Sequence, residues 1–198
     1  TMPRGPARGM PHLSNAFAVE SFIDEIAHTM REDPLKTRLR ILGEPRSLAL
    51  SAGRTLDTGR LLNVLKLVAD RIEWKNWLRT VNGLGIACWH VDGAYVATAI
   101  EAAMQGDKLT IQRVVCAVDV GRVINPTGLH GQVAGATLDA LSIAMNAAIT
   151  VKGGQVQQHD LRDYPLASMA QLPNDVEVIT VDDERDPAGA SFLAMPTV

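Results

Sequence analysis

Residues 114–126 read Val-Val-Cys-Ala-Val-Asp-Val-Gly-Arg-Val-Ile-Asn-Pro, and this stretch decides the fold class. Its opening completes an apolar run that starts near Lys108, which predicts a buried strand. Asp119 to Pro126 is rich in turn formers, and small and apolar residues follow from Gly128 to Asn146. The stretch therefore predicts a strand, a tight turn and a helix laid across a sheet.

The flanking sequence extends this pattern in both directions. Upstream, the spacing of apolar residues predicts helices over 14–33, 35–42 and 61–72, the first of them capped by Ser14 or Asn15. Strands are expected at 83–91, 95–104, 108–118 and 176–180, with a short hairpin within 148–158. Helices first, strands later and one helix over them predict an α+β fold, a mixed sheet with helices on one face.

We expect residues 1–198 to form one unit with two parts. Residues 1–75 are its mainly helical first part, and residues 76–198 are a mixed sheet with one long helix. No linker is long or biased enough to demand two independent domains.

Composition excludes several classes of protein. The chain is 46% apolar and 21% charged, which excludes wholesale disorder. No apolar run approaches the ~18 residues of a membrane helix. With 19 Lys and Arg against 22 Asp and Glu, it has no general field for nucleic acid. Cys88 and Cys116 lack the spacing of a disulfide framework or zinc site, which favours two small buried residues.

The turn at 119–126 leaves two interpretations open. Backbone N–H groups at the start of the following helix, with Arg122 nearby, would suit an anion. Alternatively the turn is structural, with Asp119 paired to Arg122 and with Asn125 capping the helix. The chemistry of the segment alone favours the structural turn.

Other polar clusters have plain explanations. Residues 182–186 carry four carboxylates but lack the alternating ligands of a calcium loop, which favours a solvated loop. Glu20 and Asp24 lie on one helix face, which is typical of a solvated stripe. The five histidines are scattered and form no metal-binding pattern.

Thr1 is a candidate of another kind. An N-terminal threonine exposed by self-cleavage can act as a nucleophile, with its own α-amine as the base. Removal of a preceding Met explains the same residue without any chemistry.

Several segments together resemble the molybdopterin-binding large subunit of molybdenum hydroxylases, of the isoquinoline 1-oxidoreductase, aldehyde oxidase and xanthine dehydrogenase type. Gly5–Gly9 and Asn15–Ala27 carry the resemblance in the first part. Val114–Pro126, Gly131–Gly135, Ile149–Val156 and Asp163–Pro165 carry it later, in the family's order. It covers nearly the whole chain and implies the C-terminal half of the molybdopterin-binding region.

The resemblance also implies a chemistry, a cofactor and a partner. The family holds a molybdenum–pterin cofactor and hydroxylates aldehydes or N-heterocycles with oxygen derived from water. The residues expected near the cofactor or its supporting loops are Gly121, Arg122, Asn125, Gln132 and Gly135. By this resemblance residues 1–198 would be one domain fragment, completed by a partner chain that supplies the N-terminal half of the fold.

The chain departs from the family where chemistry is expected. Phe192 stands where the family carries its activating glutamate, and a phenyl ring cannot accept a proton. The family's Gln-x-Glu-Gly-Gly is replaced by Gln132–Ala136, its usual Cys by Val120, and Asp139 interrupts a helix that is normally apolar.

Three functions follow from these observations. The first is a fragment of a molybdopterin-dependent oxidoreductase. The second is the processed β-chain of a self-cleaving amide or peptide hydrolase on the same fold, with Thr1 as catalytic nucleophile and the cofactor site lost. The third is a catalytically inactive structural homologue.

Overall fold

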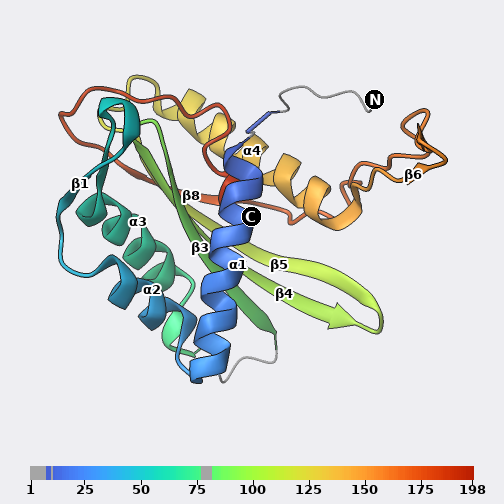
Figure 1. Ribbon diagram of the computed structural model, residues 1–198, viewed down its shortest axis with the longest axis horizontal. Helices are drawn as coiled ribbons and strands as arrows, with labels where there is room; N and C mark the ends of the chain where they lie inside the picture. The colour runs from blue at the N-terminus through green and yellow to red at the C-terminus, as the bar shows by residue number, and fades with distance from the viewer. Residues whose placement is uncertain (1–7, 10, 77–81) are drawn as a thin grey trace.

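The computed structural model describes residues 8–9, 11–76 and 82–198 and places helices around a central sheet (Figure 1). Its helices are α1 (His12–Met30), α2 (Pro34–Leu42), α3 (Thr58–Arg71) and α4 (Pro126–Asn146), with 3-10 turns at Ser51–Gly53, Trp74–Asn76 and Met195–Thr197. Its strands are β1 (Ser47–Ala49), β2 (Thr55–Asp57), β3 (Gly83–Val91), β4 (Ala94–Gln105), β5 (Lys108–Asp119), β6 (Val151–Lys152), β7 (Gln155–Val156) and β8 (Glu177–Val181). The short β1–β2 hairpin was not expected from the sequence.

The central sheet has the strand order β3-β4-β5-β8. β3, β4 and β5 are antiparallel neighbours, joined by tight turns at Asp92-Gly93 and Gly106-Asp107. β8 pairs in parallel with the second half of β5, where Val115 lies opposite Glu177. α4 lies in the connection between these two strands, because parallel neighbours need a crossover. The predicted α+β class and the mixed sheet are confirmed.

Helices cover both faces of the sheet rather than one. Tyr95 and Ala97 of β4 belong to the core under α3. The alternate residue Val96 belongs to the core under α4, together with Cys116 and Val118 of β5. The prediction of a single covered face is therefore wrong in this detail. Residues 94–99 and 114–119 are buried at every position, which is the pattern of strands enclosed on both sides.

α1 runs beside the edge strand β3 and is tied to it by a buried ion cluster. The Cys88 N–H donates to Glu20 Oε2 over 3.2 Å, and Arg38 Nε of α2 donates to the same oxygen over 2.8 Å. Arg38 Nη1 also donates to Asp24 Oδ1 over 2.6 Å. The predicted solvated stripe is therefore wrong for Glu20, because Arg38 neutralises its carboxylate inside the protein.

The first two helices begin close to, but not at, the residues predicted from capping patterns. α1 begins at His12, so the cap predicted at Ser14 or Asn15 is wrong: Pro11 is at the N-cap position, and no side chain caps the helix there. α2 begins at Pro34, one residue before the predicted range, and the Asp33 side chain caps it.

The β6–β7 hairpin projects away from the central sheet (Figure 1). No helix in the described part of the chain is long and apolar enough to cross a membrane.

Candidate functional site

The loops that follow β5 and β8 meet at the carboxyl ends of these two parallel strands. The Arg122 N–H donates to the Arg185 carbonyl oxygen over 3.0 Å, and the Ala188 N–H donates to the Val120 carbonyl oxygen over 2.8 Å. Ligands of open sheets bind at the carboxyl ends of parallel strands, where the N terminus of the crossover helix also lies. Since α4 starts directly after the first loop, this cluster of loops is the candidate site.

Two carboxylates of residues 182–186 make hydrogen bonds in these loops, and that of Asp182 joins one loop to the other. Asp182 accepts a hydrogen bond from the Val123 N–H over 3.1 Å. Asp183 accepts from the Arg185 N–H over 2.8 Å and pairs with its guanidinium over 3.1 Å. No group of three or more His, Cys, Asp or Glu side chains in residues 8–9, 11–76 and 82–198 is placed to hold a metal ion.

Gly121 is the point of closest approach between the two loops. Its φ of +72° lies in the left-handed region, which favours glycine. A Cβ atom there would lie 2.5 Å from the Asp186 carbonyl oxygen and 3.0 Å from that of Arg185. The space beside Gly121 is therefore filled by the chain itself, so this glycine serves the loop packing.

Asp119, the last residue of β5, pairs with Arg60 of α3. Arg60 Nε donates to Asp119 Oδ2 over 2.8 Å, and the Gly121 N–H donates to Oδ1 over 3.1 Å. Burial alone would raise the pKa of Asp119, but these hydrogen bonds and the charge of Arg60 outweigh it and hold that pKa below its ordinary value. The predicted pair with Arg122 is wrong, because Arg60 occupies the carboxylate.

Asn125 and Arg122 have different tasks at the start of α4. Asn125 Oδ1 accepts a hydrogen bond from the Gly128 N–H over 2.9 Å, so the predicted helix cap is confirmed. Arg122 is exposed, and its guanidinium makes no hydrogen bond or ion pair with any residue that the structure describes. It is a free cation beside a helix N terminus.

One exposed face of α4 carries two glycines, which leave the helix backbone open. Gly131, Gln132 and Gly135 lie on it, three and four residues apart. A Cβ atom built on Gly131 or Gly135 would meet no other atom within 4 Å. A flat group or another backbone can therefore approach this face closely, with the Gln132 amide available for hydrogen bonds.

The same face of α4 ends at an ion pair beside Phe192. Arg8 Nη1 lies 3.1 Å from Asp139 Oδ2, and the Arg8 guanidinium also donates to the Ser191 carbonyl oxygen. Arg8 thus provides the counter-charge for Asp139, the residue that interrupts the apolar pattern of α4. Phe192 is half-buried against the core under α4, with its ring centroid 5.9 Å from that of His12.

Sequence reasoning missed Arg60 and Arg8, the two cations that organise this region. Arg60 lies 59 positions from Asp119, and Arg8 lies 131 positions from Asp139. No local pattern connects such partners, so no signal in the sequence could have paired them.

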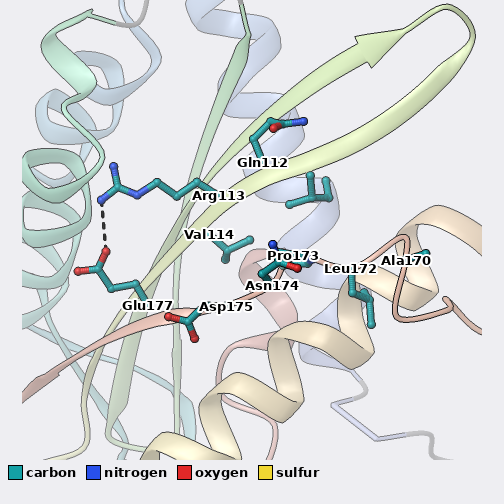
Figure 2. A pocket seen from close by; sticks show the side chains of 10 residues that line it. Gln112, Arg113, Val114, Ala170, Leu172, Pro173, Asn174, Asp175 and Glu177 are labelled. Atoms are coloured by element: carbon teal, nitrogen blue, oxygen red, sulfur yellow. Dashed lines mark hydrogen bonds and ion pairs between the residues drawn. The ribbon is translucent and has the colours of Figure 1, made fainter.

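A separate hollow of about 450 Å³ lies on another part of the sheet and includes none of the predicted site residues (Figure 2). It lies between β5, beyond the point where β8 stops pairing, and residues 170–175. Arg113 Nη2 donates to Glu177 Oε2 over 3.2 Å at its rim, and Arg71 pairs with the same carboxylate. One carboxylate therefore binds both of these cations.

Comparison with known proteins identifies the family. Residues 76–173 match the molybdopterin cofactor-binding domain, a segment that holds β3, β4, β5 and α4. These residues belong to the molybdopterin cofactor-binding domain family. The resemblance stated from the sequence is therefore confirmed.

Two curated relatives of this molybdopterin-binding domain are subunits of larger enzymes. The chain is 31% identical over 194 residues to the beta subunit of isoquinoline 1-oxidoreductase from Brevundimonas diminuta, covering 95% of this chain and 23% of that protein. It is 24% identical over 199 residues to a subunit of nicotinate dehydrogenase from Pseudomonas putida, covering 91% and 16%. The chain thus spans less than a quarter of the length of these relatives.

Solved structures include more distant neighbours. A Cu,Mo-CO dehydrogenase matches 93% of this chain and 23% of its own, with 16% identity and a TM-score of 0.47. Quinoline 2-oxidoreductase from Pseudomonas putida 86 matches 52% and 14%, with 17% identity and a TM-score of 0.47.

The residues present suit one wall of a site for the family's cofactor. Gly131 and Gly135 leave open space where a Cβ would otherwise stand, so a flat pterin can lie against the backbone of α4. Arg122 offers an unpaired cation for a phosphate group, and Gln132 offers amide groups. Gly121 contributes to the packing of the preceding loop, and Asn125 caps the start of the helix.

Proposed function

We propose that this chain is part of a molybdopterin-dependent oxidoreductase that acts on N-heterocycles or aldehydes, and that α4 forms one wall of its cofactor site. The observation that carries the proposal is the exposed face of α4, where Gly131, Gln132 and Gly135 lie open beyond the unpaired Arg122. Membership of the molybdopterin-binding family supports the cofactor, and the relatives named isoquinoline 1-oxidoreductase and nicotinate dehydrogenase support the heterocyclic substrates.

Each residue of this wall has a distinct task. The Arg122 guanidinium binds the phosphate of the cofactor as a charge-assisted donor. The Gln132 amide donates to and accepts from the polar edge of the pterin. Gly135 and Gly131 keep side chains away from its flat surface, while Gly121 and Asn125 hold the loop and the helix start in place.

When bound, the cofactor supplies transfer of oxygen derived from water and accepts the electrons. Position 192 cannot contribute a base to that chemistry, because a phenyl ring neither binds nor releases a proton. Its half-buried ring lies in an apolar cluster with Leu193 and Met195. Any proton that leaves the reacting centre must therefore go to a group other than Phe192.

The proposal includes a second polypeptide that completes the fold around residues 1–198, with residues 1–75 as the helical part and 76–198 as the sheet part. Large apolar side chains on α1 support it. Val19, Phe22 and Met30 are 45%, 61% and 56% exposed and lie along one side of the helix with Ile26. Burying such a stripe is the usual source of a helix's tertiary stability, which gives the partner a surface to cover.

The test is the cofactor content of the chain purified with its partner polypeptide. Gly135→Leu places a side chain on the open face of α4 while improving helix propensity by up to about 1 kcal/mol, so cofactor loss cannot be blamed on a weaker helix. We expect molybdenum and pterin fluorescence to fall at least about tenfold, as steric exclusion from a close contact predicts. Ala144→Leu, at an exposed α4 position on another side, is the matched control.

Unchanged content in Gly135→Leu would remove α4 from the cofactor site. Absence of both molybdenum and pterin from the unaltered complex would overturn the oxidoreductase proposal.

Phe192 favours a second candidate, a catalytically inactive homologue that retains the fold. It predicts a complex that lacks turnover of aldehydes and N-heterocycles, whether or not the cofactor is bound. Turnover by the unaltered complex would exclude it. The hydrolase alternative gains no support from the relatives found, which are oxidoreductases by name, and its nucleophile Thr1 lies outside the described residues.

A further inference from the structure

Arg60 joins three segments at the end of the sheet where the candidate site lies. Its Nε and Nη2 atoms bind the two carboxylate oxygens of Asp119 over 2.8 and 2.5 Å. Its Nη1 atom donates to the Gly93 carbonyl oxygen, in the turn between β3 and β4, over 3.0 Å. The guanidinium therefore uses its forked geometry fully, which a lysine cannot reproduce.

The surroundings of Arg60 fix its own position. Its guanidinium carbon lies 4.4 Å from the centroid of the Tyr95 ring, within the range of a cation–π contact. The Tyr95 hydroxyl accepts a hydrogen bond from the Asp57 N–H over 2.8 Å, and Asp57 in turn caps the start of α3, the helix that carries Arg60. The side chain is only 12% exposed, so the arrangement is held from every side.

Asp119 transmits this order to the loop of the candidate site. The same Oδ1 atom that binds Arg60 accepts the Gly121 N–H over 3.1 Å, which fixes the turn that precedes Arg122. The Arg122 N–H then binds the Arg185 carbonyl oxygen, and α4 begins four residues later. Arg60 itself is absent from the exposed wall and is linked to this turn through Asp119.

We propose that Arg60 is a positioning residue, which through Asp119 holds the turn that presents Arg122 and the start of α4 to the phosphate-bearing pterin. The inference rests on the proposed function and deepens it, since it names a residue on the opposite face of the sheet that controls cofactor retention. Arg60 itself does not touch the cofactor.

Arg38 offers a matched control for the effect of losing a buried ion pair. Its side chain is 1% exposed and, like that of Arg60, binds several acceptor groups on different segments through a forked guanidinium. Its hydrogen bonds go to Glu20 and Asp24 of α1 and to the Pro34 carbonyl oxygen, not to the loops at 119–123 or 182–188. Arg38→Lys therefore weakens the fold without acting on the turn.

The experiment compares Arg60→Lys, Arg60→Met and Arg38→Lys in the complex with the partner polypeptide, each at a temperature where all are folded. Amide hydrogen exchange at Gly121, Arg122 and Val123 reports on the turn, and the rate of pterin release, followed by its fluorescence, reports on retention. We expect both rates to rise at least about tenfold in Arg60→Met, with a smaller rise in Arg60→Lys, which keeps the charge but not the fork. Both rates should stay within about twofold in Arg38→Lys, as for an uncoupled site.

Two results would overturn the inference. Equal acceleration in Arg38→Lys and Arg60→Lys would show that general stability, not the turn, governs both rates. Unchanged exchange at 121–123 in Arg60→Met would show that Asp119 holds the turn unaided. A wild-type complex without any pterin overturns the proposed function and with it the ligand named here, whereas the exchange result decides the positioning role on its own.

Discussion

Glu20 and Arg38 form an ion pair that is almost completely withdrawn from water, with 10% of the Glu20 side chain and 1% of the Arg38 side chain exposed. Arg38 Nε and Glu20 Oε2 are 2.8 Å apart, and Nη2 donates to the Glu20 carbonyl oxygen over 3.2 Å. Because Glu20 also accepts from the Cys88 N–H of β3, this pair joins α1, α2 and the sheet edge.

Arg38→Met should therefore be among the most damaging substitutions in the first part of the chain. It leaves the Glu20 carboxylate buried without its cation, which typically costs about 3–5 kcal/mol. Urea unfolding followed by circular dichroism would measure the loss. Arg54→Met removes an exposed ion pair with Asp92, where we expect no more than about 1 kcal/mol. Comparable losses in the two variants would contradict the role given to the buried pair.

The pairing of Asp119 with Arg60 should appear in the pH dependence of stability. The hydrogen bonds from Arg60 and Gly121 hold the pKa of Asp119 below its ordinary value, although burial acts in the opposite direction. Over the range between the lowered and ordinary pKa, the unfolded chain binds more protons, so stability rises with pH there. The contribution is complete above the unfolded pKa of about 4 and is lost as pH falls through the folded value.

Asp119→Asn should therefore lose stability at neutral pH but show a shallower further decline below about pH 4. Unfolding free energies at several pH values between neutrality and acid would test this. Parallel curves for the variant and the unaltered chain would mean that Asp119 does not titrate differently in the folded state.

The outcome at this site shows which features a sequence can reveal. The strand, the turn and the cap at Asn125 follow from local patterns, since each depends on residues a few positions apart. The partner of Asp119 does not, because Arg122 is near in sequence but its side chain points to solvent, while Arg60 arrives from a helix on the other face. Ion pairs between distant segments have no periodicity by which they could be recognised.

The layers of the fold also depend on contacts between distant segments, which local sequence patterns do not reveal. The apolar runs at 94–99 and 114–118 predict strands. An unbroken apolar run, rather than an alternating one, is also typical of a strand that is covered on both faces of its sheet, and the prediction of one covered face did not use this feature. The parallel pairing of β8 with β5 joins strands that are far apart in the sequence, with α4 in the connection between them. The family resemblance alone points to Gln132 and Gly135 as candidate site residues, whereas the chemistry of the turn at 119–126 also suggests Arg122 as a ligand for an anion.

Gly121→Ala should destabilise the chain far more than a typical glycine substitution. The added Cβ would lie 2.5 Å from the backbone oxygen of Asp186, in addition to the strain of a positive φ. Gly153→Ala is the matched control, since its φ is +59° and its Cβ would meet no atom within 4 Å. The control should lose about 1 kcal/mol from backbone strain, and Gly121→Ala at least about 2 kcal/mol more, because two loops must separate.

Thermal or urea unfolding of both variants would measure that difference. Equal losses of unfolding free energy in the two variants would mean that the loop at 185–186 can move to accommodate the added Cβ atom. That result would contradict the role of Gly121 in the packing of the two loops.

The two cysteines should be inert in the folded protein. Cys88 and Cys116 are free and buried, as predicted from their spacing. Burial raises the pKa of the Cys116 thiol to about 12, against a smaller opposing effect of its hydrogen bond from Thr98. Burial also raises the pKa of Cys88, and the nearby Glu20 carboxylate adds to this shift. Since only the thiolate attacks disulfide reagents, neither residue should react at pH 8 while the chain is folded.

A thiol-reactive disulfide dye would test this directly, because each reaction releases a coloured product. We expect no labelling within minutes in native buffer and two equivalents at once in denaturant, where the thiol pKa returns to about 8.5. Slow labelling that follows the global unfolding rate would agree with burial on both sheet faces. Rapid labelling of one thiol would show that the core under α3 or under α4 opens locally, and Cys88→Ala and Cys116→Ala would identify which face it is.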